Sequence, residues 1–114
     1  MVSAPLAPVI ERLTAELGLS RAELASALDA SERSVARWKA GEHVPQYESR
    51  ARLEEMTVLA DRLRESFTDD AAVSTWLRAS SEYFGGRAPI DALLRGYFAS
   101  VGSALDALDA GVYA

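Results

Sequence analysis

Apolar residues recur three and four positions apart along nearly the whole chain, the spacing that places side chains on one face of an α-helix. No run of β-branched residues bounded by turn residues interrupts this pattern, so no strand is predicted. Gly, Pro and short polar residues separate the successive apolar stripes, and these residue types end and start helices. The sequence therefore predicts an all-α protein.

Three short helices are predicted before residue 45. Ser20 and Glu23 have the spacing of a capping box, in which each side chain accepts a hydrogen bond from the other residue's backbone amide. The second helix then ends in a short turn at residues 29–31, where Ser31 is placed to cap the third helix. Pro45 prevents this third helix from resuming.

Longer helical segments are predicted in the remainder of the chain. A fourth helix covers about residues 48–67, because its apolar residues have heptad-like spacing, and a shorter helix follows over residues 71–80. A last apolar stripe begins after Pro89, and Gly96 and Gly102 weaken it and are expected to divide it. The stripe comprises Ile90, Leu93, Leu94, Tyr97, Phe98, Val101, Leu105 and Leu108. Most of it is expected to be core, with a part covered by another chain.

The composition restricts the chemistry available to the chain. With 114 residues, 49% of them apolar and 25% charged, it fits one compact domain or two very small ones that share a core. Zero cysteines and a single histidine exclude disulfides, a thiolate zinc site and a cysteine nucleophile, so no metal site is expected. The N-terminal residues lack the positive region of a signal peptide, and no apolar run approaches the roughly 20 residues of a membrane span. We expect a cytoplasmic protein.

No set of residues in the sequence is typical of an enzyme. His43 lies in a turn without a second ligand or a nucleophile beside it. Gly85 and Gly86 are not followed by the Lys and Ser/Thr of a phosphate-binding loop. The sequence therefore predicts a non-enzyme that uses no cofactor.

Charge is distributed unevenly along the chain. The net charge of −5 argues against nucleic-acid binding through bulk positive charge. Residues 31–53 are nevertheless basic, with five cationic side chains against three acidic ones, whereas residues 54–114 carry a net charge of −5. The basic segment coincides with the third predicted helix and the start of the fourth.

Residues 21–45 have the pattern of a helix-turn-helix motif. Apolar side chains fall where its two helices cross, and the outward face of the second helix is left free to enter a DNA major groove. The candidate DNA-binding residues are Ser31, Arg33, Ser34, Arg37, Lys39 and Arg50. Arginines there can contact guanine edges, while Ser31, Ser34 and Arg50 can hold phosphates. The alternative is an ordinary helical hairpin with a solvated charged face.

Two parts of the sequence resemble one known family. The segment LASALDASERSVARWKAGEHVP at residues 24–45 resembles the Xre-type helix-turn-helix. The C-terminal half resembles the toxin-binding domain of Xre/MbcA/ParS-like antitoxins, and the short chain is most similar to the MbcA-like members. This second likeness is carried by Trp76-Leu77, Phe84-Gly85-Gly86, the segment PIDALL at 89–94, Val101, and residues 105–114. Ser80-Ser81 departs from the Pro-Asn usual in relatives, which puts the shape of that turn in question.

The resemblance implies three regions: a helix-turn-helix at 1–47, a connecting helix at 48–68, and a toxin-binding helical domain at 69–114. It also implies a type II antitoxin whose partner is an NAD-consuming RES-domain toxin. In MbcA-like antitoxins the C-terminal end enters the toxin's active-site cleft and blocks substrate access. Here that role would fall on Val112, Tyr113 and Ala114 with the terminal carboxylate, and Leu108 and Gly111 are expected to contact the toxin as well.

The residues themselves are compatible with this role for the C-terminus. An aromatic ring just beyond a helix end can replace a base or ribose face, and a carboxylate beside it can meet phosphate-binding cations. The alternative for these residues is a frayed terminus without function. The resemblance further implies that the antitoxin binds its own operator DNA and represses transcription, as a homo-oligomer within the complex. Two other functions stay open: a stand-alone dimeric Xre-type transcriptional regulator, and an interaction module that has lost DNA binding.

Overall fold

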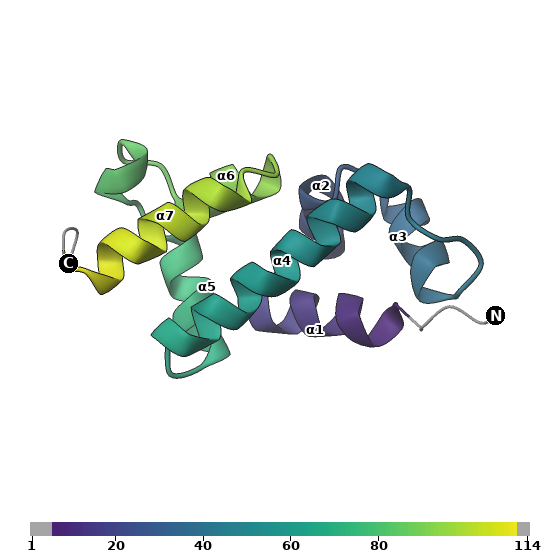
Figure 1. Cartoon of the computed structure of the whole chain (residues 1–114), viewed down its shortest axis with the longest axis horizontal. Helices are drawn as coiled ribbons and strands as arrows, with labels where there is room; N and C mark the ends of the chain where they lie inside the picture. The colour runs from purple at the N-terminus through teal and green to yellow at the C-terminus, as the bar shows by residue number, and fades with distance from the viewer. Residues whose placement is uncertain (1–5, 112–114) are drawn as a thin grey trace.

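A computed structural model describes residues 6–111 of the chain, and the predicted all-α architecture is confirmed (Figure 1). Within those residues there are seven α-helices and one short 3₁₀ helix. They are α1 (Ala7–Leu17), α2 (Arg21–Ala27), α3 (Glu32–Lys39), α4 (Tyr47–Ser66), α5 (Asp70–Arg78), η1 (Glu82–Phe84), α6 (Pro89–Leu94) and α7 (Phe98–Asp109). The helix boundaries agree with the sequence prediction to within two residues for α4 and α5.

Side-chain caps define where the short helices begin. Ser20 Oγ accepts a hydrogen bond from the Glu23 backbone N–H at 3.1 Å, and Glu23 Oε1 accepts one from the Ser20 N–H at 2.9 Å. Ser31 Oγ accepts from the Ser34 N–H at 3.0 Å. Both predicted caps are confirmed, and each satisfies amides that have no partner within the helix.

The last apolar stripe is divided at Gly96 but not at Gly102. Gly96 adopts a left-handed backbone conformation with φ 83°, which turns the chain between α6 and α7. Gly102 lies inside α7 without ending it. The turn leaves Tyr97 58% exposed, so Tyr97 belongs to the part of the stripe that the core does not cover, and its cover by another chain stays a prediction. Its neighbour Phe98 begins α7 and is buried.

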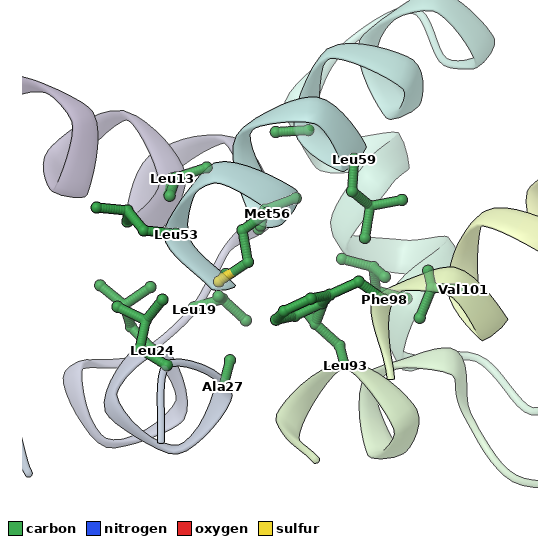
Figure 2. Close-up of a cluster of buried hydrophobic side chains, with 14 of the residues drawn as sticks. Leu13, Leu19, Leu24, Ala27, Leu53, Met56, Leu59, Leu93, Phe98 and Val101 are labelled. Carbon is green, nitrogen blue, oxygen red and sulfur yellow. The ribbon is translucent and has the colours of Figure 1, made fainter. Parts of the chain in front are cut away.

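The buried apolar side chains form one cluster that includes residues from every α-helix. Met56 of α4, which is fully buried, lies between leucines of the N-terminal helices and Phe98 of α7 (Figure 2). Burying a leucine or methionine side chain contributes about 1.5–3 kcal/mol, so this cluster is the main source of stability. Helix α1 packs against α4 and α5, α2 against α6, and α4 against α7.

A buried carboxylate connects α1 to α4. Glu16 is only 5% exposed, and its Oε1 accepts a hydrogen bond from Arg64 Nη1 at 2.6 Å. Its Oε2 lies 2.6 Å from Arg12 Nε in an ion pair, but it accepts no hydrogen bond within the described residues. Arg12 also pairs with Asp61 of α4. Because a buried charge without a partner is costly, these arginines are needed to keep Glu16 in place.

A second ionic contact connects α2 to α5. Arg78 donates to both carboxylate oxygens of Glu23, at 2.7 and 3.1 Å, and to the Gly18 carbonyl at 2.8 Å. The hydrogen bond from Arg78, with that from the Ser20 backbone N–H, lowers the pKa of Glu23 to about 2. The residue that caps α2 therefore also fixes α2 against α5.

The helices form an elongated molecule with extents of 47 × 24 × 21 Å. Helix α3 lies at one end of the long axis and the C-terminal end of α7 at the other (Figure 1). Within residues 6–111, none of the helices has the length and apolar character needed to cross a membrane.

Candidate functional site

Helices α2 and α3 are held at a fixed angle by the apolar residues that the sequence pattern identified. Leu24, Leu28, Val35 and Trp38 are all buried. The turn between the helices includes Asp29 in a left-handed conformation with φ 55°. The two helices are thus joined by a tight turn around a shared apolar contact.

The start of α4 is bound to this two-helix unit. Ser49 Oγ donates a hydrogen bond to the Leu28 carbonyl at 3.0 Å, and the Ser49 side chain is buried. Arg50 in the same helical turn is exposed. The exposed Arg50 side chain is therefore held beside the α2–α3 turn by the Ser49 hydrogen bond in the same helical turn.

Arg33 and Arg37 form the exposed face of α3. They lie four residues apart in one helix, so their side chains share a face, and both are exposed. Arg37 Nε is 3.8 Å from a Glu42 carboxylate oxygen, a loose exposed ion pair. Among residues 6–111, Arg33 makes no ion pair. These two guanidinium groups are available to an anionic partner.

The other predicted DNA-binding residues are placed differently. Ser31 and Ser34 bond to each other, with Ser31 Oγ donating to Ser34 Oγ at 3.0 Å, so both hydroxyls are engaged at the start of α3. Lys39 lies on the edge of α3 that faces α1, where its Nζ is 3.9 Å from a Glu11 oxygen. Within the predicted set, Arg33 shares one face of α3 with Arg37, and it also borders the same groove as Lys39.

A groove of about 780 Å³ lies between α1, α2 and α3, and the sequence analysis did not anticipate it. Ile10, Leu24 and Val35 contribute to its apolar lining, and Arg33 and Lys39 also line it. Its depth comes from small side chains, and the alanines that line it are Ala7, Ala15, Ala36 and Ala40. These alanines could be recognised as groove residues only once the packing of α1 on α3 was known.

A second groove, of about 440 Å³, lies between α4 and α7. Val58 of α4 lines it and is 62% exposed, although it lies in the middle of a long helix. Gly102 of α7 lines the same groove. The sequence did not predict this groove either. The apolar pattern of α4 identifies its buried stripe, but it does not show that α7 lies beside the opposite face.

The predicted toxin-binding residues fall at and beyond the end of α7. Leu108 is half-buried and packs against the core cluster. Gly111 is exposed and has a left-handed backbone with φ 75°. Val112, Tyr113 and Ala114 lie outside the described residues. Within the described residues, no group of three or more His, Cys, Asp or Glu side chains is arranged to hold a metal ion.

Comparisons with known proteins identify the family. Residues 62–111 match the family model of the antitoxin Xre/MbcA/ParS C-terminal toxin-binding domain. The mycobacterial cidal antitoxin MbcA of Mycobacterium tuberculosis strain H37Rv is 36% identical over 108 residues, which cover 95% of each chain. The chain belongs to this family of antitoxins. The MbcA protein of Mycobacterium bovis has the same identity and coverage.

A solved structure supports the same assignment for this antitoxin. A chain in the crystal structure of the M. tuberculosis MbcT–MbcA toxin–antitoxin complex superposes with a TM-score of 0.74 at 33% identity. The match covers 98% of this antitoxin and all of that chain. The relatives are named as antitoxins, which establishes a non-enzymatic role in a toxin–antitoxin pair.

The family match extends over most of the C-terminal helices of the antitoxin. It begins at residue 62, within α4, and ends at residue 111. It therefore includes one end of the α4–α7 groove as well as Leu108 and Gly111. The predicted region boundaries at residues 47 and 68 stay predictions.

Proposed function

We propose that this antitoxin neutralises a cognate RES-domain toxin that consumes NAD, by placing residues 112–114 in the toxin's active-site cleft. The observation that carries the proposal is the match along 98% of the chain to a chain in the MbcT–MbcA complex. The sequence of the C-terminus adds support, because Tyr113 offers an aromatic ring for a nucleotide pocket. Inhibition on this view is occlusion of substrate, and the antitoxin performs no chemistry.

The geometry at the end of α7 is suited to this function. Gly111 in a left-handed conformation is the usual way to end a helix and change the chain direction. Leu108, packed against the core, fixes the last helical turn. The end of α7 also lies at the opposite end of the molecule from α3 (Figure 1). A toxin bound there leaves the α3 surface uncovered.

The test compares the full chain with a variant truncated after Gly111. NAD consumption by the purified cognate toxin is measured at increasing antitoxin concentration, and complex formation is measured by calorimetry. We expect the full chain to inhibit and the truncated chain to bind the toxin without inhibiting it. A Tyr113→Ala variant, which keeps the length of the chain, is expected to inhibit less strongly. Equal inhibition by the truncated and full chains would exclude the proposal that residues 112–114 block the active site of the toxin.

We further propose that the antitoxin binds its operator as a homo-oligomer through a helix-turn-helix formed by α2 and α3. The supporting observation is the pair Arg33 and Arg37, exposed on one face of α3. A recognition helix reads base edges with such side chains, while cations such as Arg50 hold phosphates. The other candidate, a stand-alone dimeric Xre-type regulator, binds DNA without a toxin. Affinity capture of the tagged chain from its host separates the two, because only the antitoxin retains a stoichiometric NAD-consuming partner.

A further inference from the structure

The face of α4 opposite the core combines exposed apolar side chains with charged ones. Tyr47, Ala51, Val58 and Arg62 follow helical spacing along this face. Tyr47 and Val58 are among the exposed large hydrophobic residues of the described chain. Where α7 packs beside it, Ala51, Val58 and Arg62 of this face line the 440 Å³ groove. Isolated exposed apolar residues such as Tyr47 are common, but Val58 lies in the wall of a groove.

Gly102 on the opposite wall has no explanation within the chain. It occupies the interior of α7, where glycine is a poor helix former compared with alanine. Its backbone is not left-handed, and the nearest atom to a Cβ placed there would be Arg62 Nη1, at 3.8 Å. An alanine therefore fits without any clash. The space beside Gly102 is therefore open to a group that enters the groove from outside.

Unpaired acidic side chains line the groove. Glu54 and Glu55 contribute to its wall and are exposed, and neither forms an ion pair within residues 6–111. The one lining cation, Arg62, is already engaged, with Nη2 at 2.6 Å from Asp106 and 4.0 Å from Asp109. A second copy docking face to face would bring these carboxylates together, which is unfavourable. The charge of the groove instead complements a cationic partner.

We propose that this groove receives a basic, apolar-faced helix of the cognate toxin. This inference rests on the proposed antitoxin function and adds a second contact to it. An amphipathic helix can place apolar side chains over Val58 and Gly102 and its Lys or Arg side chains toward Glu54 and Glu55. The match to a toxin-binding family model covers Arg62 and the whole α7 wall. The groove supplies affinity for the toxin, whereas the C-terminus blocks its active site.

The experiment measures the dissociation constant of the full-length antitoxin for the purified cognate toxin. Val58→Arg fills the groove and adds a repelling charge, and Glu54→Lys with Glu55→Lys reverses the charge of its wall. Each is expected to weaken binding at least tenfold. Val44→Arg is the matched control, because Val44 is 59% exposed and does not line the groove. It is expected to bind as the wild type does.

Gly102→Ala is expected to raise the stability of the antitoxin and to lower its affinity for the toxin, a combination that loss of folding cannot produce. Alanine favours the helix, so the thermal midpoint of the free antitoxin is expected to rise. Its added methyl group occupies the space of the incoming helix, so affinity for the toxin is expected to fall about fivefold or more. A more stable protein that binds more weakly identifies the groove as a contact surface.

Other outcomes would overturn the proposal in distinct ways. Wild-type affinity in all three groove variants, together with normal toxin inhibition, would exclude the groove and leave the antitoxin function standing. A free antitoxin that is dimeric by light scattering and becomes monomeric on Val58→Arg would assign the groove to a second copy. Absence of any binding by the wild-type chain would overturn both this proposal and the proposed function.

Discussion

Arg52 and Gly96 are in direct contact across the junction of three helices. A Cβ on Gly96 would lie closer to Arg52 Nη1 than real Cβ contacts come. The same Nη1 donates a hydrogen bond to the Ala27 carbonyl at the end of α2, at 3.2 Å. One guanidinium group of α4 therefore binds the end of α2 and occupies the space where a side chain at position 96 would lie.

We expect Gly96→Ala to destabilise the antitoxin by about 2–4 kcal/mol, measured by urea unfolding. A left-handed backbone costs an alanine about 1 kcal/mol or more, and the new methyl group would also displace Arg52 from the Ala27 carbonyl. Gly85→Ala is the control. Gly85 has φ 66° with open space around a Cβ, so that variant shows the backbone cost alone.

The double variant Gly96→Ala with Arg52→Ala separates the two contributions. Removing the guanidinium leaves room for the methyl group, so the double variant is expected to lose less stability than the two single variants predict by addition. Strict additivity of the two losses would show that the contact between the residues does not cause the destabilisation.

The ion pair between Glu23 and Arg78 predicts a loss of stability in acid. The pKa of Glu23 is lowered from 4.5 to about 2, so its contribution is fully present above pH 4.5 and is lost as the pH falls toward 2. The expected loss is about 1–3 kcal/mol, toward the lower figure because the pair is partly exposed to solvent. The free energy of unfolding at several pH values between 2 and 6 measures it.

Glu23→Gln is the matched variant for this pH dependence. Glutamine can still accept the Ser20 amide hydrogen bond of the capping box, but it has no charge for Arg78. The stability difference between wild type and variant is therefore expected to shrink as the pH falls from 4.5. A difference that stays constant over that range would assign the acid sensitivity to other carboxylates.

Replacing both Arg33 and Arg37 with alanine is expected to abolish specific operator binding. A good contact between an arginine and a base contributes about 1–3 kcal/mol, so the pair together accounts for a loss of about 30-fold or more. Both side chains are exposed, so the fold is expected to persist. Binding to operator fragments by fluorescence anisotropy at several salt concentrations provides the measurement.

Arg87→Ala with Arg95→Ala controls for the change in net charge. These arginines are exposed, lie near α6 and make no ion pair within the described residues. This control is expected to retain specific binding. If both pairs reduce binding equally, the operator is held by overall charge and α3 does not read its sequence.

The parts of the fold that the sequence predicted depend on neighbours along the chain. Ser20 and Ser31 cap their helices through backbone groups three residues away, and such contacts are readable from spacing alone. The heptad-like spacing of apolar residues likewise predicted the helix that contains Met56, and that residue is buried because one stripe of a helix must face the core. Local chemistry and periodicity are sufficient for features of this kind.

The missed features depend on which helices meet. Gly96 and Gly102 both weaken a helix, but only the turn at Gly96, beside Arg52, decides where the stripe divides. Tyr97 was expected in a stripe that is mostly core, and the same turn directs it outward. Val58 became a candidate contact residue only when α7 was found beside it. The spacing of residues along the sequence does not predict these contacts between distant helices.

The packing of α1 against α5 has a consequence for how such antitoxins diversify. Because the first helix of the chain packs against α5 from its second half, the two halves must remain compatible where these helices meet. A recombinant gene joined between α4 and α5 would combine an α1 surface and an α5 surface that had not been selected to pack together. We expect new partner specificities to evolve in this scaffold through point substitutions at exposed positions such as Val58, while the whole chain is inherited as one block.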